Sequence, residues 1–101
     1  MENDWKLKLR YGKIKTPYKH FTLIANGFVE DLTEGFECPK GNAYMGIKIW
    51  AESEDEASDL IQSISQQIGF IITGNIEIFK TEPVQPPGEN PSGYDIQFTP
   101  F

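Results

Sequence analysis

The sequence contains a single cysteine, Cys38, and a single histidine, His20, and this scarcity excludes several kinds of site. A lone cysteine cannot form a disulfide within the chain, which fits a reducing compartment. One cysteine and one histidine also fall short of the ligand set of a structural zinc site. A Ser-His-Asp triad would have to use His20, and no Gly-x-Ser-x-Gly sequence accompanies it. We therefore predict a protein that is not an enzyme, with no catalytic residue, no metal site and no cofactor.

Long hydrophobic runs are also missing. No stretch approaches the roughly 18 apolar residues that a membrane-spanning helix requires. The opening Met1-Glu2-Asn3-Asp4 is acidic, unlike the basic start of a secretory signal. The one Asn-Pro-Ser sequence, at Asn90, has proline at the position that prevents N-glycosylation. We therefore expect a cytoplasmic protein that does not enter a membrane.

Positive charge is scarce beyond the start of the chain. From Glu30 onward the sequence holds thirteen carboxylates but only three lysines. The formal net charge is −6 and the isoelectric point is about 4.6. Such a protein repels nucleic acid and anionic lipid at long range, so nucleic acid is an unlikely partner. The basic residues near the start are Lys6, Lys8, Arg10, Lys13, Lys15 and Lys19.

The length and composition suit one compact domain. A chain of 101 residues with 39% hydrophobic residues can bury one core but not two. Residues 81–93 contain four of the seven prolines and can form neither a helix nor a central strand. We predict a single domain, 1–101, in which 81–93 is a proline-rich extended arm that leads to a C-terminal strand.

Alternating apolar and polar residues predict five strands, of which the first is the clearest. In that strand every second residue is apolar, and the residues between are Lys6, Lys8 and Arg10. We expect it to form a hairpin with the second strand. The predicted strands are 5–11, 20–29, 43–50, 70–80 and 94–99.

Three of these strands carry a feature that affects which way their side chains point. Asn26-Gly27 indicates a bulge or a bend. Gly74-Asn75 is either a hairpin turn or a bulge, and we favour one kinked strand because the arms on each side are short. In the last strand we expect Tyr94, Ile96 and Phe98 to face the same way.

One helix is predicted, and both of its ends carry clear signals. Ser53 and Glu56 match a capping box, in which the two side chains accept from each other's backbone amides. Gly69 is suited to the left-handed position that ends a helix. Apolar residues between these ends recur at helical spacing and form one stripe. They are Ala57, Leu60, Ile61, Ile64 and Ile68.

Together these elements predict an α+β fold, with a largely antiparallel sheet of four or five strands and a single helix on one face (order β-β-β-α-β-arm-β). A helix about 10 Å wide covers one face only, so the opposite face has no helix over it. If the aliphatic sides of the strands face the helix, basic and aromatic side chains lie on the uncovered face as candidate contacts for a partner. These are Lys6, Lys8, Arg10, Tyr44, Lys48 and Trp50.

This predicted face allows other interpretations. Aromatic rings among cations suit single-stranded nucleic acid, although the chain lacks an RNP1-type sequence and its net charge opposes the contact. Alternatively the lysines form a solvated surface or pair with acids on neighbouring strands. Tyr44 and Trp50 belong either to this surface or to the core.

Two acidic stretches, before and after the third predicted strand, are candidates for binding a basic partner protein. The acids at the start of the helix also have a structural cause, because the helix dipole favours negative charge there. If the two stretches form one negative lobe, the chain would attract a basic partner from a distance, as inhibitors and immunity proteins do. The candidate residues are Glu30, Asp31, Glu34, Glu37, Glu52, Asp55 and Asp59.

A homodimer is the alternative to a different partner. Packing two uncovered faces together would bring Lys6, Lys8 and Arg10 of both copies close to each other. We therefore expect a dimer to use a sheet edge or the proline-rich arm, for example by exchange of 94–101 between two copies.

Overall fold

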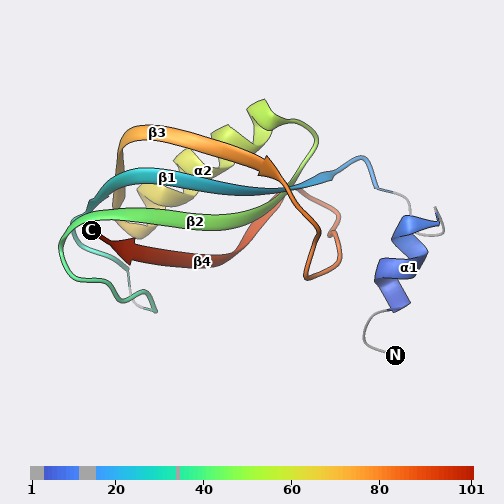
Figure 1. The fold of residues 1–101 in the computed structure, drawn as a ribbon, viewed down its shortest axis with the longest axis horizontal. Coiled ribbons are helices and arrows are strands. Elements are labelled where there is room, and N and C mark those ends of the chain that lie inside the picture. The colour runs from blue at the N-terminus through green and yellow to red at the C-terminus, as the bar shows by residue number, and fades with distance from the viewer. Residues whose placement is uncertain (1–3, 12–15, 34) are drawn as a thin grey trace.

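A computed structural model provides the structure, and it describes residues 4–11, 16–33 and 35–101. Four antiparallel strands form one sheet, α2 crosses the face away from the viewer, and α1 stands to one side (Figure 1). The fold is α+β, as predicted. Within the described residues no helix is both long and apolar enough to cross a membrane. The elements in chain order are α1 (Asp4–Arg10), β1 (Lys19–Val29), β2 (Gly41–Ala51), α2 (Glu54–Ile68), β3 (Phe70–Lys80) and β4 (Ser92–Pro100).

The strand order in the sheet is β3-β1-β2-β4. β1 and β2 form a hairpin whose pairing runs without interruption from Lys19 opposite Ala51 to Val29 opposite Gly41. α2 then carries the chain across the sheet, so that β3 pairs with the other side of β1 and β4 pairs with β2. β1 and β2 are therefore the central strands, and β3 and β4 are the edges.

The predicted strand over 5–11 is wrong, because this segment forms helix α1. β1 already has a neighbour on each side, so no position remains for a hairpin with it. Without a neighbouring strand, the backbone groups of this segment must bond to water or to each other locally. The amide of Tyr11 donates to the carbonyl of Leu7 at 3.0 Å. An alternating apolar and polar sequence therefore forms a strand only where the fold places another strand beside it.

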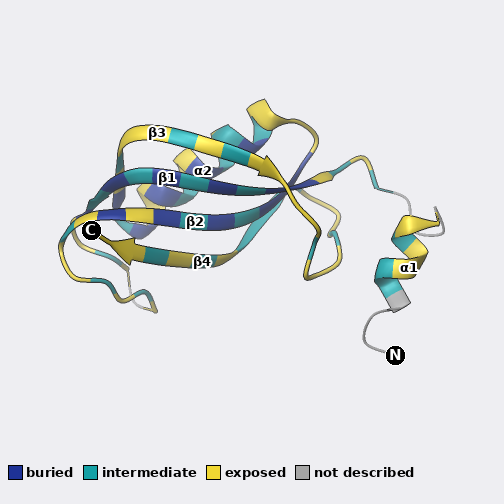
Figure 2. Cartoon of the chain, in the orientation of Figure 1, coloured by how far each residue is buried: buried dark blue, intermediate teal, exposed yellow. Residues whose placement is uncertain are grey.

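The core lies between α2 and the inner face of the sheet. Buried aliphatic and aromatic side chains come mainly from the two central strands, whereas the edge strands are largely exposed (Figure 2). Ile61 is fully buried at the centre of the apolar stripe of α2. The predicted ends of α2 are confirmed: the Ser53 hydroxyl accepts from the Glu56 amide at 3.2 Å, and Gly69 has a φ of 92°.

β3 is one kinked strand, as favoured from the sequence. Ala25 pairs with Ile76 and Gly27 pairs with Ile72, so β3 has two more residues than β1 across this step. The irregularity predicted at Asn26-Gly27 is real, but the additional residues belong to β3. β1 itself stays in register with β2.

β4 contains a bulge that sequence reasoning missed. Gly46 pairs with Gln97 and Lys48 pairs with Tyr94, which leaves one additional residue in β4, and Asp95 there has a φ of 55°. A bulge places two successive side chains on the same side of a strand. Ile96 packs against the core, while Tyr94 lies on the opposite face, so the prediction that the two face the same way is wrong.

Candidate protein-binding face

We call the side of the sheet opposite α2 the open face. It follows from the strand register, because residues paired across neighbouring strands point to the same side. Thr22 lies opposite both Lys48 and Phe79, and the inner-face residue Leu23 lies opposite Ile47 and Ile78. Tyr44 and Lys48 are on the open face, as predicted.

The proline-rich arm covers one end of the open face. Trp50 is 2% exposed, and its indole N–H donates to the carbonyl oxygen of Gln85 at 3.1 Å. Further along the arm, the carbonyl oxygen of Glu89 accepts from the Tyr18 hydroxyl at 3.0 Å. Trp50 therefore faces the predicted side, but the arm buries it, and its prediction as a partner contact is wrong.

His20 lies under the same arm, in a closed set of hydrogen bonds. Its Nδ1 donates to the carbonyl oxygen of Thr81 at 3.1 Å, because a carbonyl can only accept. The Tyr94 hydroxyl accepts from the Val84 amide at 3.2 Å and donates to Nε2 of His20 at 2.6 Å. The imidazole is also in edge-to-face contact with Trp50, with ring centroids 5.0 Å apart. His20 thus ties together the starts of β1, β4 and the arm.

This arrangement suits a neutral imidazole. The pKa of His20 is lowered from its ordinary value of 6.5, mainly because the imidazole is buried. The hydrogen bond to Thr81 raises the pKa, the charge of Lys48 lowers it and the charge of Glu82 raises it, but burial is the largest effect. His20 is 6% exposed and both of its nitrogens are engaged within the chain. A shallow hollow of about 380 Å³ borders it. No ring nitrogen is left to exchange a proton with a substrate, so the geometry describes a structural tie.

We expect acid to destabilise the protein through His20. The unfolded chain binds the imidazole proton at higher pH than the folded chain, so the free energy of unfolding is larger above pH about 6.5 and falls as the pH is lowered through the folded pKa. His20 is the only histidine in the chain, so no other imidazole contributes to this pH dependence. Urea unfolding at pH about 7.5 and about 5.5 measures the difference. His20→Gln should remove most of it, and an undiminished pH effect in that variant would contradict the assignment.

The part of the open face beyond the arm carries large apolar side chains without cover. Tyr44 is 40% exposed, and its ring stacks on that of Phe101, with centroids 4.6 Å apart. Gly46 has no side chain, and a hollow of about 370 Å³ lies around it. We call the exposed apolar residues of this face, together with the half-buried Ile24 and Phe28, the apolar patch. They are Ile24, Phe28, Tyr44, Ile71, Phe79 and Phe101.

The open face is not basic. Lys6, Lys8 and Arg10 are in α1, away from the sheet, so their prediction as sheet-face contacts is wrong. Lys48 forms an ion pair with Asp95, whose pKa is lowered first by the hydrogen bond from Lys48 and then by that from Gln97. The cations that motivated a contact with single-stranded nucleic acid are therefore either elsewhere or paired.

The two acidic stretches do not form a single lobe. Glu30 and Asp31 lie beside the end of α2, where the Glu30 amide approaches the Gly69 carbonyl, and Glu37 lies in the same connection. Glu52, Asp55 and Asp59 lie at the start of α2. Fifteen helical residues separate the two ends by about 22 Å. The prediction of one lobe is wrong, and Glu34 lies outside the described residues.

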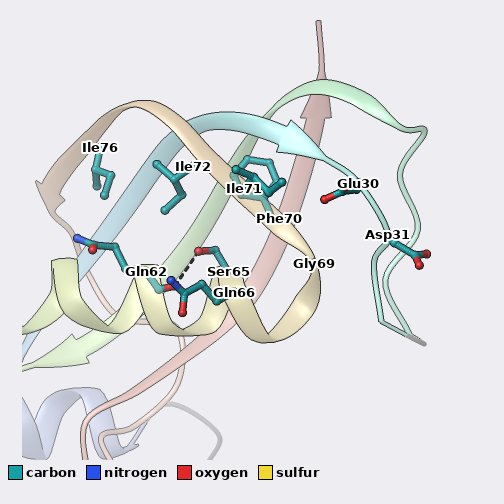
Figure 3. A pocket seen from close by; sticks show the side chains of 10 residues that line it. All are labelled: Glu30, Asp31, Gln62, Ser65, Gln66, Gly69, Phe70, Ile71, Ile72 and Ile76. Atoms are coloured by element: carbon teal, nitrogen blue, oxygen red, sulfur yellow. Dashed lines mark hydrogen bonds between the residues drawn. The ribbon is translucent and has the colours of Figure 1, made fainter.

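A groove runs between α2 and β3 on the inner side of the sheet (Figure 3). Its volume is about 640 Å³, and Glu30 and Asp31 lie at one end. Ile72 and Ile76 of β3 point toward the amides of α2, Gln62 and Gln66. Sequence reasoning missed this groove, because its position depends on which strand forms the edge next to α2.

No protein-family model, curated protein or solved structure matches the chain. Among the described residues, His, Cys, Asp and Glu side chains form no group of three that could hold a metal ion. Cys38 is half-buried and packs against the margin of the core. The assignment of function therefore depends on the surfaces of the chain itself.

Proposed function

We propose that the chain is a small acidic, non-catalytic protein that acts by binding another protein, and that the apolar patch is its contact surface. The negative charge of the chain favours a basic partner, such as a toxin that an immunity-type protein neutralises. The apolar patch is the observation that carries the proposal. On one face, four of its large side chains, Tyr44, Ile71, Phe79 and Phe101, are between 40% and 61% exposed.

Several large apolar side chains exposed on the same face favour a protein contact site. Aromatic side chains are enriched in such contacts, because they bury a large area at low entropic cost. The arm and His20 hold one end of this face in place, so the patch is presented on a fixed sheet. Preorganisation of this kind lowers the entropic cost of binding.

The charge around the patch supports a basic partner. Residues 19–101 carry thirteen carboxylates and four lysines, and the lysine on the open face is already paired with Asp95. Glu77 lies on the open face opposite Ile24 and beside the patch. Such a charge distribution accelerates the approach of a positively charged protein and disfavours an acidic one.

Site-specific photo-crosslinking in the native host tests the proposal. Benzoylphenylalanine replaces Tyr44 or Phe79 in the patch, and replaces the exposed Gln67 of α2 as the matched control. The patch positions should yield adducts with one basic protein that the control position does not yield. The association rate with that purified protein should fall several-fold between about 50 mM and about 500 mM NaCl.

Three outcomes would contradict this account. Equal adducts from the patch and from Gln67 would show that the patch has no specific contact. An adduct from Tyr44 with only a second copy of the chain would favour a homodimer through the patch instead. Affinity that is insensitive to salt would remove the argument for a basic partner.

A further inference from the structure

The length and the surroundings of α1 do little to stabilise it as a helix. It has seven residues, whereas isolated helices need about 12–15 to persist in water. Among the described elements, no strand and not α2 packs against it. Leu9 of this helix lines a hollow beside Trp50 and Pro83. The helix itself leaves Leu7 52% and Tyr11 72% exposed.

The apolar residues of this segment fit a strand better than a helix. In a helix, Trp5 and Leu9 lie on one side and Leu7 and Tyr11 on nearly the opposite side, so no single surface can bury all four. In an extended conformation the same four residues point to one side and the three cations to the other. The segment would therefore bury more apolar surface as a strand added to a sheet edge.

Of the two sheet edges, β3 is the better acceptor. β4 contains the bulge at Asp95 and ends at Pro100, and both features hinder the addition of a strand. β3 contains no proline. Beyond its kink, five successive residues, 76–80, pair regularly with β1 and leave their other side free of any described strand.

The groove beside this edge provides space for apolar side chains. Ile76 lines the groove, and Ile78 next to it is half-buried at the margin of the core. A strand added along β3 would place alternate side chains in the groove and the remaining ones on the open face. With Leu7 and Leu9 in the groove, the cations would lie on the side of Glu77.

We propose that two copies of the chain exchange their N-terminal segments. Trp5–Tyr11 of each copy lies extended along residues 76–80 of β3 in the other, with Leu7 and Leu9 in the groove beside α2. The segment carries three cations and the acceptor body is strongly acidic, so the contact is complementary in charge. Reciprocal exchange across a twofold axis forms two such contacts at once. This dimer shares Phe79 with the apolar patch, whereas Tyr44 lies on β2, which β1 separates from the acceptor edge. The dimer does not require the proposed partner.

The position of α1 in the structure favours a second copy as the occupant over the segment's own chain. Leu9 of the same chain lies at the arm, on the side of the open face. The groove lies on the inner side, beyond β3. A second copy can approach that edge directly.

Sedimentation velocity on the full chain and two variants tests the exchange. The unmodified chain should have the mass of two copies, against 11.5 kDa for one. Replacing Leu7→Asp and Leu9→Asp together should raise the dissociation constant about a hundredfold, because two apolar contacts are lost. Val84→Asp, at an equally exposed apolar residue of the arm, is the control and should leave the dimer intact. A monomeric unmodified chain, or a dimer that survives the paired substitution, would overturn the proposal.

Disulfide trapping identifies the groove and its occupant. In a Cys38→Ser background, a tagged chain with Leu9→Cys is mixed with an untagged chain with Gln66→Cys. The expected product is a disulfide between the tagged and untagged chains, whereas Gln67→Cys, on the neighbouring exposed position, should give far less. A disulfide that forms only within one chain carrying both cysteines would show that the segment occupies its own groove, and would refute the exchange. Tyr44→Glu should leave this trapping unchanged, so failure of the proposed partner site is distinguished from failure of the dimer.

Discussion

Replacing Trp50 with alanine is expected to lower the free energy of unfolding by about 3–5 kcal/mol. Trp50 is 2% exposed, and its indole holds the arm through the Gln85 carbonyl. The substitution removes a large buried side chain and leaves a cavity beneath the arm, next to His20. Urea unfolding measures the loss of stability. Cleavage by a Glu-specific protease after Glu89 should become faster, because the arm loses its hydrogen bond and packing contact with the indole.

Trp50→Phe is the matched control for this prediction. It retains an aromatic ring but loses the indole donor, so the expected loss is about 1 kcal/mol. If Trp50→Ala unfolded at the same urea concentration as the unmodified chain, the arm could not be stabilised through this side chain. The open face would then be larger than the apolar patch, and its covered end would be available to a partner.

The features that the sequence predicted correctly are those with local causes. Ser53 and Gly69 set the ends of α2 through contacts within a few residues of each other. The aliphatic side of β2 faces the helix, so Tyr44 and Lys48 were placed correctly on the other side. The kink in β3 is marked by Gly74-Asn75, which are themselves part of it.

The features that could not be predicted depend on neighbours distant in the sequence. Residues 5–11 have the pattern of a strand, but β3 occupies the place beside β1 that a hairpin would need. The bulge at Asp95 arises from pairing with β2, and the sequence of β4 alternates as though it were absent. The two acidic stretches flank β2 in the sequence. They lie at opposite ends of β2 in the structure, because a strand is extended.

The residues of the candidate site also divide into those that local sequence predicts and those that depend on distant neighbours. Tyr44 was identified because its own strand alternates clearly. Ile71, Phe79 and Phe101 were not, because the orientation of the edge strands depends on the strand order and on two register shifts. The burial of Trp50 depends on the arm, whose path over the sheet is held by hydrogen bonds to side chains from distant parts of the sequence. These side chains are Tyr18, His20, Trp50 and Tyr94.

Gly27→Ala is expected to destabilise the fold by about 3 kcal/mol, through overpacking between the central strand and β3. A Cβ atom on Gly27 would overlap the carbonyl oxygen of Ile71 and would lie 2.6 Å from the ring of Phe70. Backbone cannot move aside as a side chain does, so β3 would have to separate from β1. Because Ile71 belongs to the apolar patch, binding at the patch should weaken as well.

Gly46→Ala provides a control of identical chemistry in the neighbouring strand. The nearest atom to a Cβ on Gly46 is the Gln97 carbonyl oxygen, at 4.0 Å, so the added methyl group fits without displacement. Alanine also loses less conformational entropy than glycine on folding, and we expect a change between zero and a gain of about 1 kcal/mol. Chemical unfolding of both variants gives the comparison. Equal stability of the two would mean that β3 does not approach β1 closely at Gly27, and the kink that shapes the edge of the groove would need another cause.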